Sequence, residues 1–125
     1  MLERRRKWPD IEIDRLHAGL VLDRLIALHV FGWQEWQPGH PHAMPTFVVH
    51  PVTGAIERCL QEVWSCGGPE YPECASSYHF STDERSAAEV YRLLPARLQD
   101  WRLTPLEICK TALRWQQQLL AGTAA

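Results

Sequence analysis

The sequence predicts a single α+β domain. Two capped helix starts lie in the second half of the chain, an amphipathic helix lies near its beginning, and proline and glycine break the middle into strand-length pieces. A length of 125 residues fits one domain, and 46% hydrophobic with 22% charged residues is typical of a folded chain. We place a basic tail at residues 1–9 and the domain at residues 10–125.

The first helix is expected from about residue 20 to residue 31. Its apolar face follows the spacing i, i+3, i+4 and i+7, with Leu22, Leu25, Ile26 and His29. A short capped turn over residues 10–16 is expected before it, and Gly19 separates the two. Gly32 fits the position just after the helix ends.

The strands are expected in the proline-rich middle of the chain. Residues 46–52 predict a strand that Pro51 ends or confines to a sheet edge, and Thr53 and Gly54 predict a turn. Residues 55–65 are ambiguous, because their apolar positions also fit helical spacing. We favour a strand, since a lone strand at 46–52 would leave its backbone donors unsatisfied.

Two capping boxes predict helix starts in the second half. In residues 81–84 (Ser-Thr-Asp-Glu) the serine would cap the helix and the glutamate would reach back, and Pro95 would end this helix. Residues 104–107 (Thr-Pro-Leu-Glu) form the second box, with proline at the first helical position. The segment 98–103 between them leaves room for one short strand or a loop.

Charge and composition exclude several function classes. A formal net charge of −2 argues against a protein that coats duplex nucleic acid, which needs a basic excess. The basic start leads into Trp8 and Pro9 instead of an apolar signal region, and no apolar run is long enough to span a membrane. We therefore expect a cytoplasmic protein whose cysteines are thiols.

No familiar catalytic motif is present, so an enzyme is not expected. The chain has no Gly-x-Ser-x-Gly, no phosphate-binding P-loop and no His-Glu-x-x-His. A Cys–His pair that meets only in the folded chain is the remaining catalytic alternative. No cofactor is predicted.

Two histidines and two cysteines in the middle of the chain are weak candidates for zinc ligands. Its members are His40, His42, Cys66 and Cys74. The two cysteines lie too far apart for a usual zinc-binding pair, so we favour loop histidines and free thiols over a metal site.

The candidate binding residues gather before and within the helix start at residue 81. Ser81, Thr82 and Asp83 lie where backbone donors and the helix dipole favour an anion, although plain capping is the main alternative. The charge of Asp83 would repel phosphate and would suit a ribose hydroxyl or an adenine amine better.

Three further side chains flank this helix start. Tyr78 can stack on a base and His79 can donate to a phosphate. Arg85 lies in the first turn, where the helix dipole favours acids, and a ligand or a pairing with Asp83 or Glu89 would account for it.

Six tryptophans are many for a chain of this length. Core packing is the favoured account, and a stacking surface is the functional alternative. Trp33 and Trp36 lie close together in an extended piece, so one of them can face outward as a stacking platform or a dimer contact.

Three segments, taken in order, carry a family resemblance. They are residues 18–33, which begin Ala18-Gly19-Leu20-Val21; residues 78–90, which begin Tyr78-His79-Phe80-Ser81; and residues 104–113, which begin Thr104-Pro105-Leu106-Glu107. Together they resemble the phage ABA-sandwich domain of small phage and prophage proteins. The resemblance implies a small antiparallel sheet layered between helices, a three-layer sandwich.

The resemblance also implies a function. One branch associated with this family consists of anti-Thoeris sponges, which hold a cyclic ADP-ribose-type immune signal without degrading it. Family members carry a β-hairpin between the second and third segments. Residues 96–103 are too short for one here, so the long region 34–77 is expected to supply replacement strands.

These observations lead to one expected function and two rivals. We expect a phage anti-defence sponge that sequesters a cyclic nucleotide or cyclic ADP-ribose-type molecule and that assembles as a homo-oligomer. A phage accessory protein that binds other proteins through its tryptophan-rich middle is the first rival. A hydrolase whose catalytic group forms only in three dimensions is the second.

Overall fold

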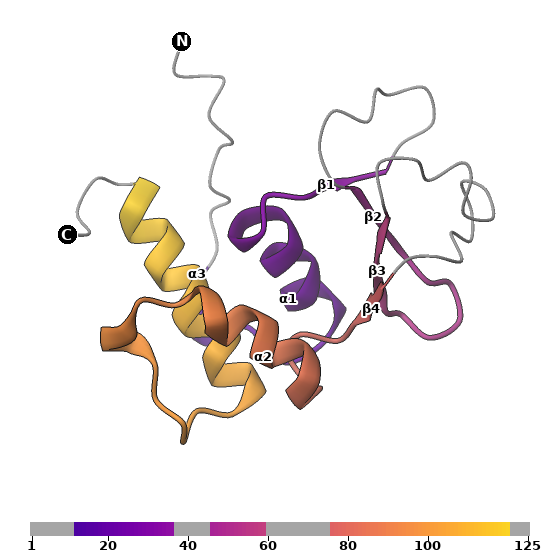
Figure 1. Ribbon diagram of the computed structural model, residues 1–125. Coiled ribbons are helices and arrows are strands. Elements are labelled where there is room, and N and C mark those ends of the chain that lie inside the picture. Colours follow the sequence, from indigo (N-terminus) through magenta and orange to yellow (C-terminus); the bar gives the residue numbers. More distant parts are fainter. Residues whose placement is uncertain (1–11, 37–45, 60–75, 121–125) are drawn as a thin grey trace, which may run out of the picture.

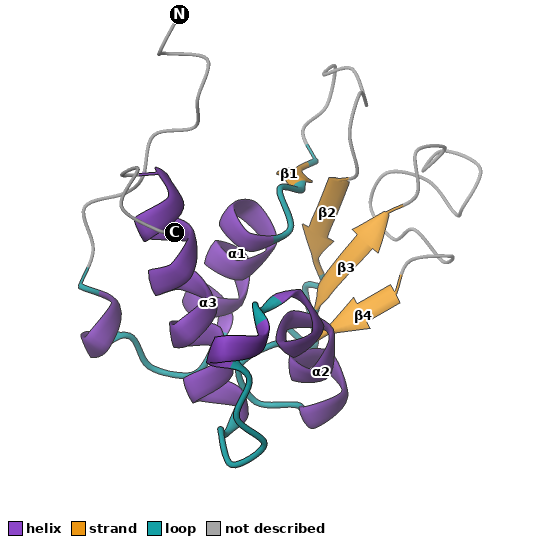
Figure 2. Cartoon of the chain, turned by 60° about the vertical axis from the view of Figure 1, so that its left-hand side comes forward, coloured by secondary structure: helices purple, strands orange, loops and turns teal. Residues whose placement is uncertain are grey.

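Helices and a sheet lie side by side in this domain. The computed structural model describes residues 12–36, 46–59 and 76–120 (Figure 1). Helices α1, α2 and α3 lie together on one side of a four-stranded sheet in both views (Figures 1 and 2). This arrangement confirms the predicted α+β class, with a small sheet layered against helices.

The first helix is confirmed close to its predicted bounds. Helix α1 covers Leu20–Leu25 and continues directly as the π-helical turn η3, Ile26–Val30. Gly32 follows with a φ of 75°, a left-handed conformation that glycine adopts without strain. Before α1 a single 3-10 turn, η2, covers Ile13–Arg15, within the turn expected at residues 10–16.

The sheet is mixed, with the order β1-β2-β3-β4. The strands are β1 (Gln34–Glu35), β2 (Thr46–Val49), β3 (Ile56–Cys59) and β4 (Ser76–Tyr78). The β2–β3 and β3–β4 pairs are antiparallel, but β1 and β2 are parallel. The expectation of an antiparallel sheet is therefore wrong for the β1–β2 pair, in which the two strands run in the same direction.

The hairpin of the middle region is confirmed. Strand β3 occupies the first part of the ambiguous segment 55–65, and residues 60–65 lie outside the described residues. Gly54, with a φ of 75°, lies in the predicted turn, and its amide donates to the carbonyl of His50 at 2.9 Å. The middle region thus supplies strands, as expected from the short segment between the last two helices.

One face of the sheet is directed at the helices. Phe47 on β2 and Ile56 on β3 are fully buried. Phe47 lies opposite Arg58, and Ile56 lies opposite Tyr78. Because opposed residues of antiparallel strands share a face, all four side chains extend from the face that packs against the helices.

Two helices close the domain. Helix α2 covers Glu84–Leu93, a 3-10 turn η5 covers Ala96–Leu98, and helix α3 covers Pro105–Leu120. Pro95 follows the C-cap of α2 as predicted. The core that these helices share with α1 and the sheet includes Leu22, Ile26, Phe80, Val90, Ile108, Ala112 and Leu113. No helix in the described part of the chain is long and apolar enough to cross a membrane.

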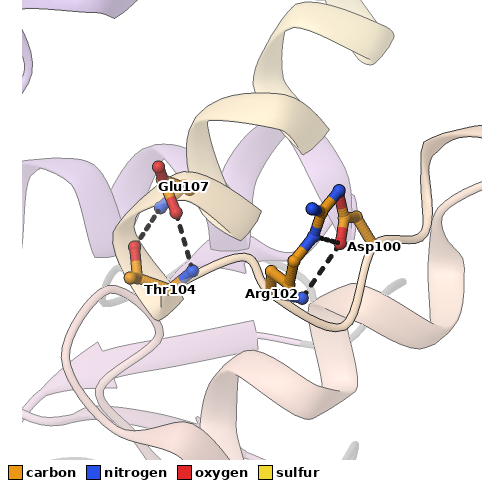
Figure 3. Close-up of polar contacts among 4 residues, drawn as sticks. All are labelled: Asp100, Arg102, Thr104 and Glu107. Atoms are coloured by element: carbon orange, nitrogen blue, oxygen red, sulfur yellow. Dashed lines mark hydrogen bonds and ion pairs between the residues drawn. The ribbon is translucent and has the colours of Figure 1, made fainter.

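The second predicted capping box is confirmed (Figure 3). The amide of Thr104 donates to Oε1 of Glu107 at 2.9 Å, and the amide of Glu107 donates to Oγ1 of Thr104 at 3.2 Å. Just before it, Asp100 accepts from the backbone amide and the guanidinium of Arg102, each at 3.0 Å. Local contacts therefore define how the chain enters α3.

We predict that Thr104→Ala lowers the free energy of unfolding by about 1 kcal/mol, because the Glu107 amide loses its acceptor. Urea unfolding followed by circular dichroism measures the change. Thr104→Ser retains the hydroxyl and serves as the control, with stability close to that of the parent. Equal losses in both variants would contradict the capping role.

Candidate ligand-binding groove

An open groove of about 430 Å³ lies where β4 leads into α2. Its lining comes from the end of the strand and the first two turns of the helix: Ser77, Tyr78, His79, Asp83, Arg85, Ser86 and Glu89. Four predicted binding residues, Tyr78, His79, Asp83 and Arg85, therefore border one hollow. The other four predicted residues lie elsewhere.

A tight turn between β4 and α2 positions these side chains. The backbone carbonyl of His79 accepts from the amide of Asp83 at 2.8 Å. Asp83 caps α2, since its Oδ2 accepts from the amide of Ser86 at 2.9 Å and from the Ser86 hydroxyl at 3.1 Å. The Ser86 hydroxyl in turn accepts from the amide of His79 at 3.0 Å. Three residues therefore fix one another at the base of the groove.

The predicted capping role of Ser81 is wrong. Helix α2 begins at Glu84 with Asp83 as its N-cap, two residues later than the motif suggested. Ser81 is 2% exposed, and its hydroxyl accepts from the amide of Gly19 at 2.8 Å. The side chain is committed to the start of α1 and does not line the groove. Thr82 is exposed but does not line it either.

Asp23 on α1 is the buried partner of this junction. Its Oδ1 accepts from the amide of Ser81 at 2.8 Å, and the residue is 2% exposed. Burial raises the pKa of the Asp23 carboxyl, and the hydrogen bonds from Ser81 offset part of that rise. Sequence reasoning missed Asp23, although it lies three and four residues before Ile26 and Ala27, on the apolar side of the helix.

The two predicted tryptophans do not line the groove. Trp33 is 6% exposed, and its ring centroid lies 4.7 Å from that of Phe31 and 5.6 Å from that of Tyr78. It packs in the core and supports Tyr78 from within, which agrees with core packing. The backbone amide of Trp36 donates to the carbonyl of Phe47 at 2.9 Å, next to the parallel strand pair.

Among the described residues, the acids of the groove contact other protein groups, whereas two of its donors do not. Glu89 pairs with Arg92 at 3.2 Å, and Asp83 is held by Ser86. Across the described residues, the Arg85 guanidinium and the His79 imidazole make no hydrogen bond or ion pair. The expected pairing of Arg85 with Asp83 or Glu89 is thus not formed. Two nitrogen-bearing side chains remain available to a ligand.

Asp83 stays ionised at neutral pH. The hydrogen bonds from the Ser86 amide and hydroxyl lower the pKa of its carboxyl, and the nearby Arg85 adds to the effect. Its Oδ2 receives both bonds from Ser86, which leaves Oδ1 able to accept from a hydroxyl or an amine.

A second, slightly larger hollow of about 460 Å³ is a weaker candidate. It lies between η2 and the second half of α3, and Asp14 and Arg114 are among its lining residues. These two form an ion pair, and the Asp14 carbonyl accepts from Nζ of Lys110 at 2.9 Å. Its principal charges are therefore already satisfied by the protein.

Metal binding and thiol chemistry receive no support from the described residues. No group of three or more His, Cys, Asp or Glu suited to a metal occurs among them. The zinc candidates His40, His42, Cys66 and Cys74 lie outside the described residues. Cys109 is fully buried in α3, and burial raises the pKa of its thiol, with the nearby Asp23 charge adding to the rise. Such a thiol is a poor nucleophile.

We predict that the contribution of Asp23 to the free energy of unfolding decreases as pH rises. Its pKa is raised in the folded state, so this contribution is fully present below the usual aspartate pKa of about 4 and disappears as pH rises through the folded pKa. In Asp23→Asn the buried charge is absent. The variant should therefore gain stability relative to the parent from about pH 4 upward, measured by urea unfolding across pH.

The difference in stability between Asp23→Asn and the parent isolates the effect of the Asp23 charge. The lowered pKa values of Asp83 and Asp100 make both proteins less stable at low pH, and this contribution cancels in the difference. Asp23→Ala is the matched control. It leaves the buried Ser81 amide without its acceptor and should lose about 1–3 kcal/mol throughout the pH range. A pH-independent difference between Asp23→Asn and the parent would contradict the buried charge.

Comparisons with known proteins add no assignment to this geometry. Neither the family models, nor the curated proteins, nor the solved structures contain a match to the chain. What the groove can do must therefore follow from its own side chains.

Proposed function

We propose that the protein binds a nucleotide-derived anion in the groove between β4 and α2 and holds it without chemical change. One observation carries the proposal: the Arg85 guanidinium and the His79 imidazole line a hollow and do not pair with its carboxylates, which contact Ser86 and Arg92. An anion can meet these two donors without first displacing a protein partner.

The donor set suits a phosphate. A guanidinium binds two phosphate oxygens at once through its fork of N–H groups, and a histidine ring donates to a third. The N-terminal end of α2 adds a favourable dipole, since Arg85 lies in its first turn. The helix dipole and the hydrogen-bonding capacity of Arg85 and His79 thus agree at this end of the groove.

The other end of the groove suits a nucleoside. Tyr78 is braced from the core, with its ring centroid 5.0 Å from Phe80 and 5.6 Å from Trp33. A braced aromatic ring can contact a base at little entropic cost. Oδ1 of Asp83 can accept from a ribose hydroxyl or an adenine amine. These contacts favour a nucleotide over a simple inorganic anion.

We further propose that the ligand is a cyclic ADP-ribose-type immune signal and that the protein is a phage anti-defence sponge acting in the host cytoplasm. Residues 78–90, which carry the groove, are one of the three segments that resemble the phage ABA-sandwich family. A sponge needs affinity for its ligand but no nucleophile. The poor nucleophilicity of the buried Cys109 thiol is compatible with that function.

Isothermal titration calorimetry with cyclic ADP-ribose tests the proposal. We predict binding that Arg85→Met weakens by about tenfold or more, because a hydrogen bond to a charged group is lost. Arg97→Met is the matched control: this exposed arginine lies in η5, away from the groove, and its loss should leave affinity unchanged.

Heat denaturation of the loaded protein separates the possible functions. A sponge releases intact cyclic ADP-ribose, and an enzyme releases a linear product. Binding that is equally strong in the parent and in Arg85→Met would contradict the groove assignment, and release of product would contradict sequestration.

Protein binding is the second candidate, and one observation favours it. Trp101 is 86% exposed in the turn between η5 and α3, beside the Asp100–Arg102 pair that fixes this turn (Figure 3). Tryptophan and arginine are frequent binding hot spots at protein interfaces. In this case Trp101→Ala would abolish capture of a partner protein and leave nucleotide titrations unchanged.

A further inference from the structure

Arg58 occupies an unusual place for a charged residue. It lies on β3 two positions after the fully buried Ile56 and directly opposite the fully buried Phe47. Because side chains alternate along a strand, Arg58 extends from the same face of the sheet as these two residues. That face packs against the helices, so the guanidinium starts from the apolar side of the sheet.

The guanidinium rests on an aromatic ring and not on an acid. Its Cζ lies 5.5 Å from the centroid of the Trp33 ring, within the range of a cation–π contact. Its Nε is buried and has no hydrogen-bond partner. Across the described residues, no carboxylate pairs with Arg58.

The contrast with other arginines is informative. Five arginines in the described part of the chain pair with carboxylates, namely Arg15, Arg24, Arg92, Arg102 and Arg114. All five are more exposed to solvent screening than a guanidinium on the core-facing side of a sheet, where an acid partner would be worth more. Within the described ranges, Arg58 is therefore a core-facing arginine that no carboxylate pairs with.

Stability alone does not explain this arrangement. A buried N–H without a partner destabilises the folded state, and the cation–π contact offsets only part of that effect. An apolar side chain of similar length would pack against Trp33 without the unsatisfied donor. The residue is better explained by a function that needs its charge and its planar fork of donors.

We infer that Arg58 is a recognition point for an oxyanion, a carboxylate or a phosphate group of a ligand. The terminal nitrogens of the guanidinium bind two oxygens of the anion side by side, which is the geometry that arginine offers and lysine does not. Trp33 supports the guanidinium through the cation–π contact, and stacking of Trp33 on Phe31 holds that ring in place.

This site is distinct from the groove of the proposed function. Arg58 does not line that groove, although both Arg58 and Tyr78 contact Trp33. The inference therefore stands on the environment of Arg58 and does not depend on nucleotide binding by Arg85.

Nuclear magnetic resonance of the arginine side chains tests the inference. In protein labelled with ¹⁵N-arginine, the Nε–H signal of Arg58 is assigned by its loss in Arg58→Met. We expect this signal to shift and saturate on titration with inorganic phosphate or with acetate at constant ionic strength. Saturation by phosphate alone assigns a phosphate ligand, and tighter saturation by acetate assigns a carboxylate.

Two variants complete the test. Arg58→Lys keeps the charge but not the fork, so we expect anion binding about tenfold weaker or more, followed by the signals of neighbouring amides. In Arg58→Met the neighbouring amide signals should show no saturable response, and the Tm should equal or exceed that of the parent, since the unsatisfied donor is gone. Arg85→Met should leave the Arg58 response unchanged, which separates this site from the groove.

No saturable shift of the Arg58 signal with either anion would overturn the inference. The same saturable response of the neighbouring amides in Arg58→Met as in the parent would overturn it too. A clear loss of Tm in Arg58→Met would show that the stacked guanidinium stabilises the fold, and the functional explanation of its unsatisfied donor would then fail.

Discussion

The described part of the domain depends on one hydrogen bond, in which the backbone amide of Ser81 donates to the buried side chain of Asp23. This bond measures 2.8 Å, and the Ser81 hydroxyl accepts from the amide of Gly19 at the same distance. Asp23 and Ser81 are 58 positions apart in the chain, and Gly19 and Ser81 are 62 positions apart. The two hydrogen bonds hold the junction between β4 and α2 against the beginning of α1, inside the apolar core where an unsatisfied amide would be costly.

The groove follows from that attachment. Because Ser81 is occupied with α1, the next acid, Asp83, becomes the cap of α2 and takes Ser86 as its partner. Arg85 is thereby placed in the first turn of α2, where it lines the groove with His79 and forms no ion pair with Asp83 or Glu89. The same principle holds at the sheet, where an arginine rests on a tryptophan ring without an acid. We propose that side chains such as Arg85 and Arg58, which have no carboxylate partner among the described residues, give this small domain its capacity to bind anions.

Local signals made much of the fold predictable, and distant contacts account for what was missed. The capping box at 104–107 was visible because both of its partners lie within one turn. Ser81 carried the same signal, but its partners lie on α1, so the motif indicated the wrong cap. Four groove residues were found because they are neighbours in sequence. Arg58 was missed because residues 55–65 also fit helical spacing, although alternation with Ile56 marks it as core-facing once the strand is recognised.

We propose that the junction fixed by Asp23 presents an anion-binding groove. Chemical-shift mapping of the backbone amides tests this binding most directly. On titration of ¹⁵N-labelled protein with ADP-ribose, the account predicts saturating shifts concentrated in residues 77–89, with the Asp23–Ser81 contact preserved. Shifts confined to other parts of the chain, or none at concentrations that saturate typical nucleotide-binding proteins, would contradict it.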